Sequence, residues 1–338
     1  MKILVTGGAG YVGSIVILHL VNEGHSIKCL DRFFFGSEYL SGKQFADKVE
    51  LIRDDIRWFD ENLLNGMDAV IDMAALSNDP VGDLDPAKTY EINHLGRSRV
   101  AKLSKKLGVK KYVLASSASI YGQQKDVVNE DSEVNPITDY SKANRKAELD
   151  VLPLDDDGFT VTVLRFSSIY GLSPRMRFDL AVNSMALELY KTKKISVRGQ
   201  SNTRPFIHIQ DVARAYAIIM NTPKEKISGH IFNVGSDEQN YEIGKLAKEV
   251  GDSIGKQYEI ESKDTHDHRS YVASFKKIRE VLGFTTKHSV GDGSREVYSA
   301  LENGSLVDST KTITVEWYKH LLASHEFMQQ VSLNGSIL

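Results

Sequence analysis

Short apolar runs alternate with amphipathic stretches along the first half of the chain. Runs rich in β-branched residues predict strands over 2–6, 26–31, 49–53, 69–73, 111–116 and 159–166. Between them, apolar positions at helical spacing predict helices over 11–23, 86–107 and 140–149. Strands and helices that alternate at this spacing are typical of an α/β fold with a parallel, doubly wound sheet and helices on both of its faces.

The pattern changes after about residue 171. Longer helices are predicted over 177–191, 241–253, 291–302 and 312–330, with short strands between them. A chain of 338 residues is also large for one hydrophobic core. We therefore expect a nucleotide-binding domain over 1–171 and a smaller α/β lobe over 172–330, with the segment near 206–234 able to return to the first domain.

Composition narrows the classes of function. The chain is 41% hydrophobic and 26% charged, with a net charge of −3 and no sustained basic run, so nucleic acid is not an expected partner. One cysteine cannot form an intramolecular disulfide or a Cys-rich metal site, and the histidines lack metal-ligand spacing. The apolar run 15–21 is too short to cross a bilayer, and the start of the chain does not read as a targeting segment. These features predict a cytoplasmic protein without a metal site and without a membrane partner.

The strongest chemical motif is the glycine-rich loop Gly7-Gly8-Ala9-Gly10-Tyr11-Val12-Gly13. It follows a predicted strand and opens a predicted helix, as in Rossmann-type dinucleotide sites. Glycines at 7, 10 and 13 let the backbone turn tightly and approach a pyrophosphate, which then faces the helix N-terminus. The alternative is a glycine-rich turn without a ligand.

Further cofactor contacts are expected where later strands end. Asp31 ends the second strand, where a carboxylate can bind the adenosine ribose and repel a 2′-phosphate, so NAD is favoured over NADP. Arg32 argues for NADP instead, because an arginine can pair with the 2′-phosphate. After the third and fourth strands, Asp55 and Ile56 can hold the adenine edge, and the small residues Ala74 and Ala75 let a cofactor lie close.

Several stretches in this order resemble the extended short-chain dehydrogenase/reductase family, in its branch of sugar-nucleotide epimerases and dehydratases. The resemblance extends from Met1 to about Phe284. Beyond the glycine-rich loop, the matching stretches are Asp72-Met73-Ala74-Ala75, Asp85-Pro86 with Asn93, Ser116-Ser117-Ala118-Ser119-Ile120-Tyr121-Gly122, Leu164-Arg165-Phe166-Ser167-Ser168-Ile169-Tyr170-Gly171, Arg204-Pro205-Phe206-Ile207-His208-Ile209-Gln210-Asp211-Val212-Ala213, and Asp267-His268-Arg269-Ser270-Tyr271 ahead of Leu282-Gly283-Phe284.

The resemblance implies that NAD stays bound and exchanges a hydride with a nucleotide-activated sugar through a keto intermediate. In that pattern Tyr140 is the general acid/base and Ser117 hydrogen-bonds the reacting oxygen. The resemblance also places Asn93, Ser116 and Phe166 beside the cofactor.

One position departs from the family pattern. The family has a lysine four residues after the tyrosine, whereas this chain has Asn144. A free tyrosine has a pKa of about 10, so it needs a cationic neighbour to act near neutral pH. Asn144 can still hydrogen-bond a ribose hydroxyl, but it adds no charge. Tyr140 then depends on the positive nicotinamide ring or on a residue from elsewhere in the chain.

Candidate substrate residues lie in several loops. Ser77 and Asn78 follow the fourth strand, at the edge where ligands bind in open α/β sheets. Ser168 stands where many members of the family have an asparagine near the substrate's diphosphate. Arginines suit a diphosphate because the guanidinium group is a planar cationic fork. Four arginines are candidates for this role, and each alternatively is a solvated surface charge: Arg175, Arg177, Arg204 and Arg269.

These observations favour an NAD-dependent sugar-nucleotide epimerase. A 4,6-dehydratase is the next hypothesis, but the acidic pair typical of dehydratases is absent from Ala118, Ser119 and Ile120. A non-catalytic NAD-binding regulator is suggested by Asn144, and an NAD(P)H-dependent keto-sugar reductase by Arg32. The helices over 86–107 and after Tyr140 form the dimer interface of relatives, so a homodimer is expected.

Overall fold

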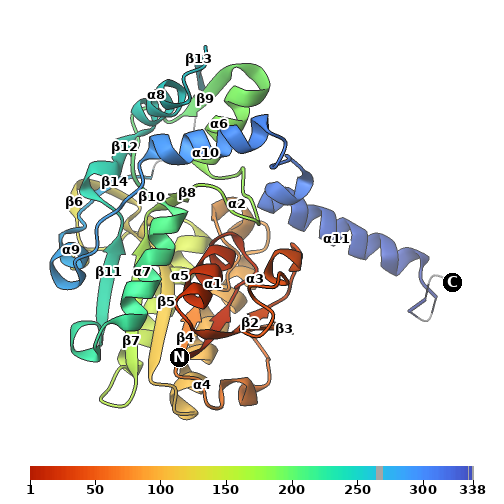
Figure 1. The fold of residues 1–338 in the computed structure, drawn as a ribbon, viewed down its shortest axis with the longest axis vertical. Helices are drawn as coiled ribbons and strands as arrows, with labels where there is room; N and C mark the ends of the chain where they lie inside the picture. The colour runs from red at the N-terminus through yellow and green to blue at the C-terminus, as the bar shows by residue number, and fades with distance from the viewer. Residues whose placement is uncertain (264–268, 334, 337–338) are drawn as a thin grey trace.

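The larger lobe is built on a parallel sheet of seven strands (Figure 1). The computed structural model describes residues 1–263, 269–333 and 335–336. In spatial order the strands are β11 (His230–Val234), β7 (Thr160–Phe166), β5 (Lys111–Ser117), β4 (Ala69–Asp72), β1 (Lys2–Thr6), β2 (Ser26–Asp31) and β3 (Val49–Arg53). Every neighbouring pair in this sheet is parallel. The α/β, doubly wound fold that the sequence predicts is therefore confirmed.

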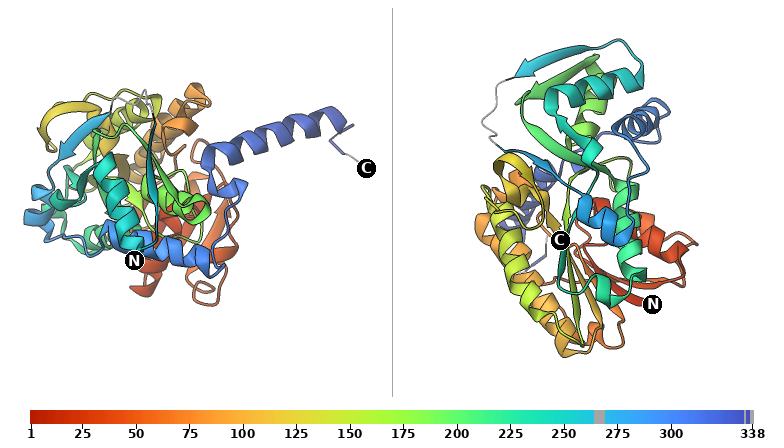
Figure 2. Two further views of the ribbon diagram at one scale, coloured as in Figure 1. Left: turned by 90° about the horizontal axis from the view of Figure 1, so that it is seen from above. Right: turned by 90° about the vertical axis from the view of Figure 1, so that its left-hand side faces the viewer.

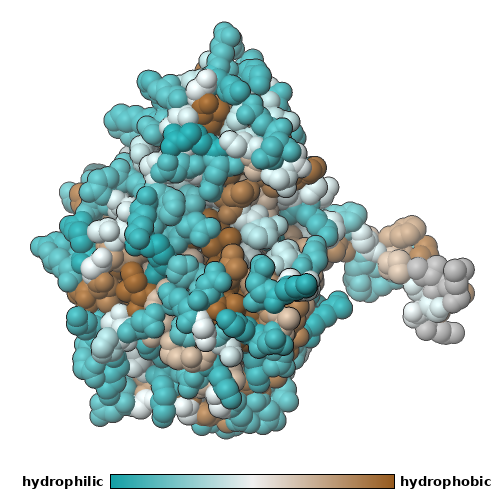
Figure 3. Space-filling view, in the orientation of Figure 1, coloured by the Kyte–Doolittle hydropathy of each residue, from teal (hydrophilic) through white to brown (hydrophobic). Residues whose placement is uncertain are grey.

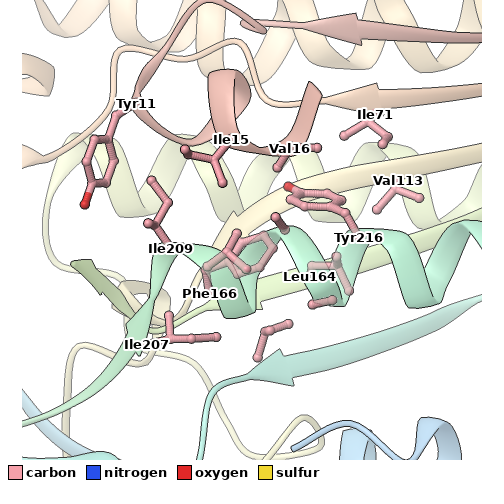
Figure 4. Packing of buried hydrophobic residues seen from close by; sticks show 14 of the residues in the cluster. Tyr11, Ile15, Val16, Ile71, Val113, Leu164, Phe166, Ile207, Ile209 and Tyr216 are labelled. Atoms are coloured by element: carbon pink, nitrogen blue, oxygen red, sulfur yellow. The ribbon is translucent and has the colours of Figure 1, made fainter. Parts of the chain in front are cut away.

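Helices cover both faces of the sheet, which explains the apolar strands. All residues of β4 and β7 are buried, because strands covered on both faces meet no solvent. On one face α1 (Tyr11–Asn22) packs against α7 (Ile209–Asn221), and apolar side chains of both helices meet those of the sheet (Figure 4). On the other face lie α4 (Arg97–Lys106) and α5 (Asp139–Val151).

Two predicted helices differ in the structure. The segment 86–107 is not one α-helix: α3 (Pro86–Tyr90) leads into the π-helical segment η3 (Glu91–Gly96), and α4 follows. A π-helical turn contains about one residue more than an α-helical turn. Side chains before and after this turn therefore do not share one face at simple α-helical spacing. The helix predicted over 177–191 begins later, as α6 (Ala181–Thr192), because Arg177 and Asp179 are used in a loop at the cavity described below.

The smaller lobe lies above the carboxyl ends of the sheet strands (Figure 1). It contains α6, β9 (Lys194–Arg198), α8 (Ile243–Ile254), β13 (Glu259–Lys263) and α10 (Val290–Glu302), and its apolar residues form a core of their own. A three-stranded sheet of β8 (Ser168–Tyr170), β10 (Thr203–His208) and β12 (Asn240–Glu242) lies at the junction. After β10 the chain returns to the larger lobe as α7 and β11.

Shorter elements complete the described part of the chain. They are η1 (Glu38–Leu40), η2 (Glu61–Leu64), α2 (Asp79–Gly82), η4 (Ala118–Tyr121), β6 (Gln123–Val128), η5 (Leu152–Leu154), η6 (Lys224–Lys226), η7 (Asp237–Gln239), β14 (Ser270–Ala273), α9 (Lys276–Leu282) and η8 (Thr310–Thr312). Within residues 1–263, 269–333 and 335–336, no helix combines the length and the apolar character needed to cross a membrane.

The last helix, α11 (Thr314–Val331), extends away from the body of the molecule, as Figure 1 and the left-hand view of Figure 2 show. Its first turns are anchored: the Trp317 indole donates to the Phe34 carbonyl at 2.7 Å, and Tyr318 makes edge contacts with Phe34 and Phe35. Farther out, apolar side chains such as Phe327 and Met328 are exposed, and they gather near the outer end of the helix (Figure 3).

A buried ion pair fixes α5 to the sheet. Glu148 on α5 accepts two hydrogen bonds from Arg165 on β7, at 3.0 and 2.9 Å, and both side chains are almost fully buried. Ser116 on β5 donates to the same carboxylate at 2.6 Å, and Arg145 reaches it at 2.9 Å. Because this carboxylate joins α5, β5 and β7, it sets the position of the helix relative to the strand ends.

This network leads to a stability prediction. Replacing Glu148 by alanine leaves the buried guanidinium of Arg165 without its counter-charge, so the free energy of unfolding should fall by about 3–5 kcal/mol. Denaturant unfolding followed by circular dichroism measures this change. The control is Glu61→Ala, which removes an exposed pair with Lys106 and should leave the unfolding midpoint almost unchanged. Equal midpoints for both variants would contradict the role assigned to Glu148.

Candidate active site

A cavity of about 770 Å³ lies where the two lobes meet, at the carboxyl ends of β4, β5 and β7. Its volume is in the range of ordinary ligand sites. The larger lobe contributes residues near the glycine-rich loop, β5 and α5, and the smaller lobe contributes polar and charged side chains. The lining residues used below are Tyr11, Val12, Ala75, Ser77, Asn78, Asp79, Arg97, Ser116, Ser117, Tyr140, Asn144, Phe166, Ser168, Arg177, Asp179, Glu188, Arg198, Arg204, Tyr216 and Arg269.

The glycine-rich loop is folded so tightly that side chains have no room. Gly7 has a φ of +67°, and a Cβ there would lie 2.8 Å from the Cα of Ala74. A Cβ on Gly13 would lie 2.5 Å from the Gly7 carbonyl oxygen. Both obstacles are backbone atoms, so these positions need glycine. Gly10 is the N-cap of α1.

The N-terminus of α1 has the features of an anion site. No side chain caps it, and no acidic residue lies in its first turn. The first N–H groups of a helix have no partner within the helix, and the helix dipole favours a negative group there. Tyr11 and Val12, in this first turn, line the cavity. The loop therefore fits the pyrophosphate of a dinucleotide.

Asp31 lies directly beside this loop. Its carboxylate accepts hydrogen bonds from the backbone N–H of Ala9 at 3.0 Å and of Phe33 at 2.8 Å. Burial raises the pKa of Asp31, and these backbone N–H groups act to lower it. The carboxylate thus closes the loop at the end of β2, where a ribose would lie in a Rossmann site.

Arg32 and Asp55 contact each other. The Arg32 guanidinium donates to Asp55 at 2.8 Å, and Arg57 donates to the same carboxylate at 2.9 and 2.8 Å. Burial acts to raise the pKa of Asp55, but the hydrogen bonds from Arg57 and Arg32 outweigh it and lower the pKa to about 2. The Arg32 guanidinium, which could have paired with the 2′-phosphate of NADP, is thus paired with a carboxylate of the protein itself. Ile56 is buried in the core.

Tyr140 and Ser117 face the same cavity from α5 and from the end of β5. Burial raises the pKa of Tyr140 and the Asp79 carboxylate raises it further, whereas Arg97, Ser117 and Arg177 lower it. The Ser117 hydroxyl donates to the Ser119 hydroxyl at 2.9 Å and accepts from the Ser119 backbone N–H at 3.1 Å. The cavity thus brings together two candidate catalytic residues that lie far apart in the sequence.

Asn144 lies one turn after Tyr140 and also faces the cavity. Its amide donates to the Tyr140 carbonyl at 2.9 Å, and its Oδ1 accepts from the Arg97 guanidinium at 2.8 Å. Arg97 is 1% exposed, which is exceptional for an arginine. Sequence analysis missed Arg97 because a single arginine on a helix gives no pattern, although the absence of a lysine at 144 indicated that a cation was missing.

Other predicted cofactor residues contact the protein itself. The Ser116 hydroxyl donates to Glu148, so its side chain is occupied in the buried network. Asn93 binds the backbone N–H and carbonyl of Leu76 at 2.8 and 2.9 Å, and it thereby orders the loop after β4. Phe166 lines the cavity beside Tyr216, with ring centroids 5.3 Å apart. The backbone N–H of Ala74 donates to the Thr6 hydroxyl, and Ala75 lines the cavity.

On the substrate side, one arginine organises two loops. Arg177 donates to both oxygens of Asp179 at 2.9 Å and to the hydroxyl and carbonyl of Ser77 at 3.0 and 3.2 Å. Asn78 donates to Asp179 at 2.8 Å and has a φ of +99°, which is unusual for a residue with a side chain. Loop 77–79 of the larger lobe is thus bound to loop 177–179.

Arg204 and Arg269 lie together at another part of the wall. The Arg204 Nε donates to the Arg269 carbonyl at 3.2 Å, and Arg269 pairs with Asp79. Ser168, on β8, lies opposite Phe206 of β10. Asp267 and His268, which belong to the same matching stretch, are outside the described residues.

Arg175 is placed elsewhere. It does not line the cavity, and its guanidinium stacks on Phe35, 3.6 Å from the ring centroid, and donates to Thr314 on α11. Its charge acts on Asp31 at the end of β2 as well as on Asp179. Within residues 1–263, 269–333 and 335–336, no group of three His, Cys, Asp or Glu side chains suits a metal ion.

The parallel sheet, the glycine-rich loop at the start of α1 and the cavity between the lobes are features of the class of dinucleotide-binding α/β proteins. The sequence profile of the NAD dependent epimerase/dehydratase family matches residues 3–235. The chain belongs to this family, whose cofactor is NAD.

Known proteins similar to this chain carry out several reactions. The chain is 29% identical over 311 residues to UDP-glucose 4-epimerase of Lactobacillus helveticus, covering 85% of this chain and 93% of that protein. It is 26% identical over 320 residues to UDP-glucuronic acid decarboxylase 1 of Arabidopsis thaliana, covering 90% and 70%. UDP-glucuronic acid 4-epimerase from Bacillus cereus, solved with UDP-glucuronic acid and NAD, has the same fold, with a TM-score of 0.80, 23% identity and coverage of 90% and 99%.

The glycine-rich loop supports a binding prediction. Gly13→Ala places a methyl group against backbone atoms of the loop, so it should weaken NAD binding by about tenfold or more, which corresponds to about 1.4 kcal/mol or more. Isothermal titration calorimetry with NAD measures the change. Gly158→Ala is the matched control, because a Cβ there meets nothing closer than a flexible Asp156 oxygen at 3.5 Å. Unchanged affinity in Gly13→Ala would place the cofactor elsewhere.

Proposed function

We propose that this protein is an NAD-dependent epimerase of nucleoside diphosphate sugars. The observation that carries the proposal is the joint placement of Tyr140 and Ser117 in one cavity that is also lined by several arginines. A hydroxyl-bearing, anionic ligand in this cavity meets both an acid/base and cationic donors. The family membership and the similarity to a UDP-glucose 4-epimerase support the same assignment.

The cofactor site is assigned to the glycine-rich loop and the strand ends around it. Gly7, Gly10 and Gly13 keep the loop open to a pyrophosphate, and the N–H groups at the start of α1 face it. Asp31 receives the adenosine ribose, and Asp55 and Ile56 border the adenine. NAD, when bound, supplies the reversible acceptance of a hydride from a sugar carbon.

The residues of the chain then handle the proton and the substrate. Tyr140 removes the proton from the sugar hydroxyl and later returns it, while Ser117 donates a hydrogen bond to the same oxygen. Arg204 and Arg269 bind the diphosphate through planar, cationic donors. Ser77 and Asn78, held by Arg177 and Asp179, border the sugar. Rotation of the keto sugar between removal and return inverts one carbon.

Epimerisation is favoured over dehydration by the state of the carboxylates in the cavity. Loss of water from the sugar needs an acid that is available to the leaving hydroxyl. Among the described lining residues, Asp79 is paired with Arg269, Asp179 with Arg177, and Glu188 accepts from the Ser196 backbone N–H. All three carboxylates are thus engaged in protein contacts. The similarity to a decarboxylase leaves a UDP-uronic acid as one of the substrates to test.

A substrate panel tests the proposal. We expect the NAD-loaded protein to bind one class among UDP-, dTDP-, GDP- and CDP-sugars in calorimetry and to give a new sugar signal in product NMR. Tyr140→Phe should lower kcat by about 10²–10⁴-fold while NAD binding stays unchanged, because the phenol serves proton transfer.

Tyr190→Phe, which changes a half-exposed tyrosine away from the cavity, is the control and should keep full turnover. Binding of a sugar nucleotide without turnover in the unchanged protein would favour a non-catalytic NAD-binding regulator, the alternative that Asn144 suggests. An absence of binding across the panel would overturn the sugar-nucleotide assignment.

We also propose a homodimer, formed through η3 and α5. Leu95 on η3 and Leu149 on α5 are 57% and 55% exposed, and they neighbour the pair of His94 and Asp150, which joins the two helices at 3.0 Å. Two exposed leucines on adjacent helices suit a helical interface between copies.

Light scattering on the unchanged protein should give the mass of two chains. Leu149→Glu should shift it toward one chain, since a buried, unpaired carboxylate opposes the interface. Val307→Glu, at a residue that is 71% exposed in the loop between α10 and η8, should leave the dimer intact. The mass of a single chain for the unchanged protein would rule out the dimer.

A further inference from the structure

The chain has no lysine beside the tyrosine of α5, yet it buries an arginine there. Arg97 begins α4, directly after the π-helical segment η3, and its side chain reaches the cavity between the ends of β4 and β5. Its Nη2 donates to the carbonyl oxygen of Asp72 at 3.1 Å and to that of Ala115, and its Nη1 donates to Asn144 at 2.8 Å. A guanidinium so enclosed has one orientation.

We propose that Arg97, oriented by Asn144, supplies the fixed positive charge that Tyr140 needs in order to act as an acid/base. The inference rests on the proposed function, because it concerns the same tyrosine. Arg97 acts through Tyr140, and Asn144 acts through Arg97, so both are positioning residues. The cation comes from α4 instead of from the helix that carries the tyrosine.

The groups that accept hydrogen bonds from Arg97 are neutral. Asn144 and the two carbonyl groups are neutral acceptors, and the nearest carboxylate, Asp72, is 4.0 Å from Nε. Burial raises the pKa of Asp72, whose oxygens are hydrogen-bonded to Thr6 and Tyr112. The Nε of Arg97 and the hydroxyl of Tyr216, which also lines the cavity, are buried without a hydrogen-bond partner. Arg97 is thus paired with the buried Asp72 at 4.0 Å, without a hydrogen bond between the two side chains.

Four groups around the Tyr140 phenol affect its ionisation. Asp79 disfavours the phenolate, while Ser117, Arg97 and Arg177 favour it. Asp79 is paired with Arg269, and Arg177 forms a two-bond ion pair with Asp179. Of the two cations that act on Tyr140, Arg97 is thus the one whose carboxylate partner is farther away, at 4.0 Å instead of 2.9 Å. Arginine keeps its charge at any pH at which a tyrosine titrates.

The decisive variant is Asn144→Asp, which has nearly the same shape. The aspartate still accepts the hydrogen bond from Arg97, whereas the bond from the Asn144 amide to the Tyr140 carbonyl is lost, so Asn144→Leu, which removes both bonds without adding charge, is the control for the structural role. The added negative charge, however, cancels the cation beside Tyr140. We expect the pKa of Tyr140 to rise by about one pH unit or more, the size of effect that a nearby charge produces in a buried site.

A set of companion variants completes the test. Arg97→Met should raise the pKa of Tyr140 in the same way, and Arg97→Met combined with Asn144→Lys should restore it, because the cation then comes from α5. Arg99→Met removes a neighbouring arginine of α4 that donates to Phe59 and does not line the cavity, so it should change nothing. Thermal unfolding and circular dichroism confirm that each variant is folded.

The readout is a spectrophotometric pH titration of tyrosinate absorption, with Tyr140→Phe in each background to identify the step that belongs to Tyr140. This measurement needs no substrate, so it stands even if the substrate panel finds no turnover. Where turnover is found, the acid limb of the kcat profile should move to higher pH together with the titration. If the Tyr140 step stays in place in Asn144→Asp and the double variant restores nothing, the proposal is wrong.

Discussion

The buried ion pair between Glu148 and Arg165 is the interaction on which the rest of the site depends. It holds α5 against β7, and through Ser116 it also holds the end of β5. Tyr140 and Asn144 lie on that helix, and Ser117 follows Ser116 on that strand. Because a charge pair in the core tolerates little displacement without losing hydrogen bonds, it sets the distance between the phenol and the hydroxyl. The acid/base pair of the site is therefore positioned by residues that do not face the cavity.

The strands, the parallel sheet and the glycine-rich loop could be predicted from the sequence, because each has a local signal. Strands such as β4 and β7 are buried on both faces, so they read as unbroken apolar runs. At positions 7 and 13 a Cβ would collide with backbone atoms. Only glycine fits there, so the tight loop can be recognised from the glycines in the sequence. The division of the chain into domains and the roles of individual site residues remain predictions.

Other features depended on contacts between distant segments. The π-helical turn η3 was not predictable, because the residues around it have an ordinary helical pattern. Ser116 and Asn93 lie in stretches that match the family, but their side chains bind Glu148 and the Leu76 backbone. Arg175 stands in the same loop as Arg177, yet it does not line the cavity and stacks on Phe35 instead. For such residues, tertiary packing decides which way the side chain points, and the spacing of residues in the sequence does not predict it.

The described lining of the cavity contains arginine at five positions, namely Arg97, Arg177, Arg198, Arg204 and Arg269, and no lysine. A lysine amine can lose its proton and condense with a carbonyl to form a Schiff base, whereas the guanidinium group stays protonated and does not act as a nucleophile. A keto sugar held in this cavity therefore meets strong electrostatic binding without a competing amine. The same lining is resistant to reagents and modifications directed at amines, such as acetylation, which leave guanidinium groups unchanged.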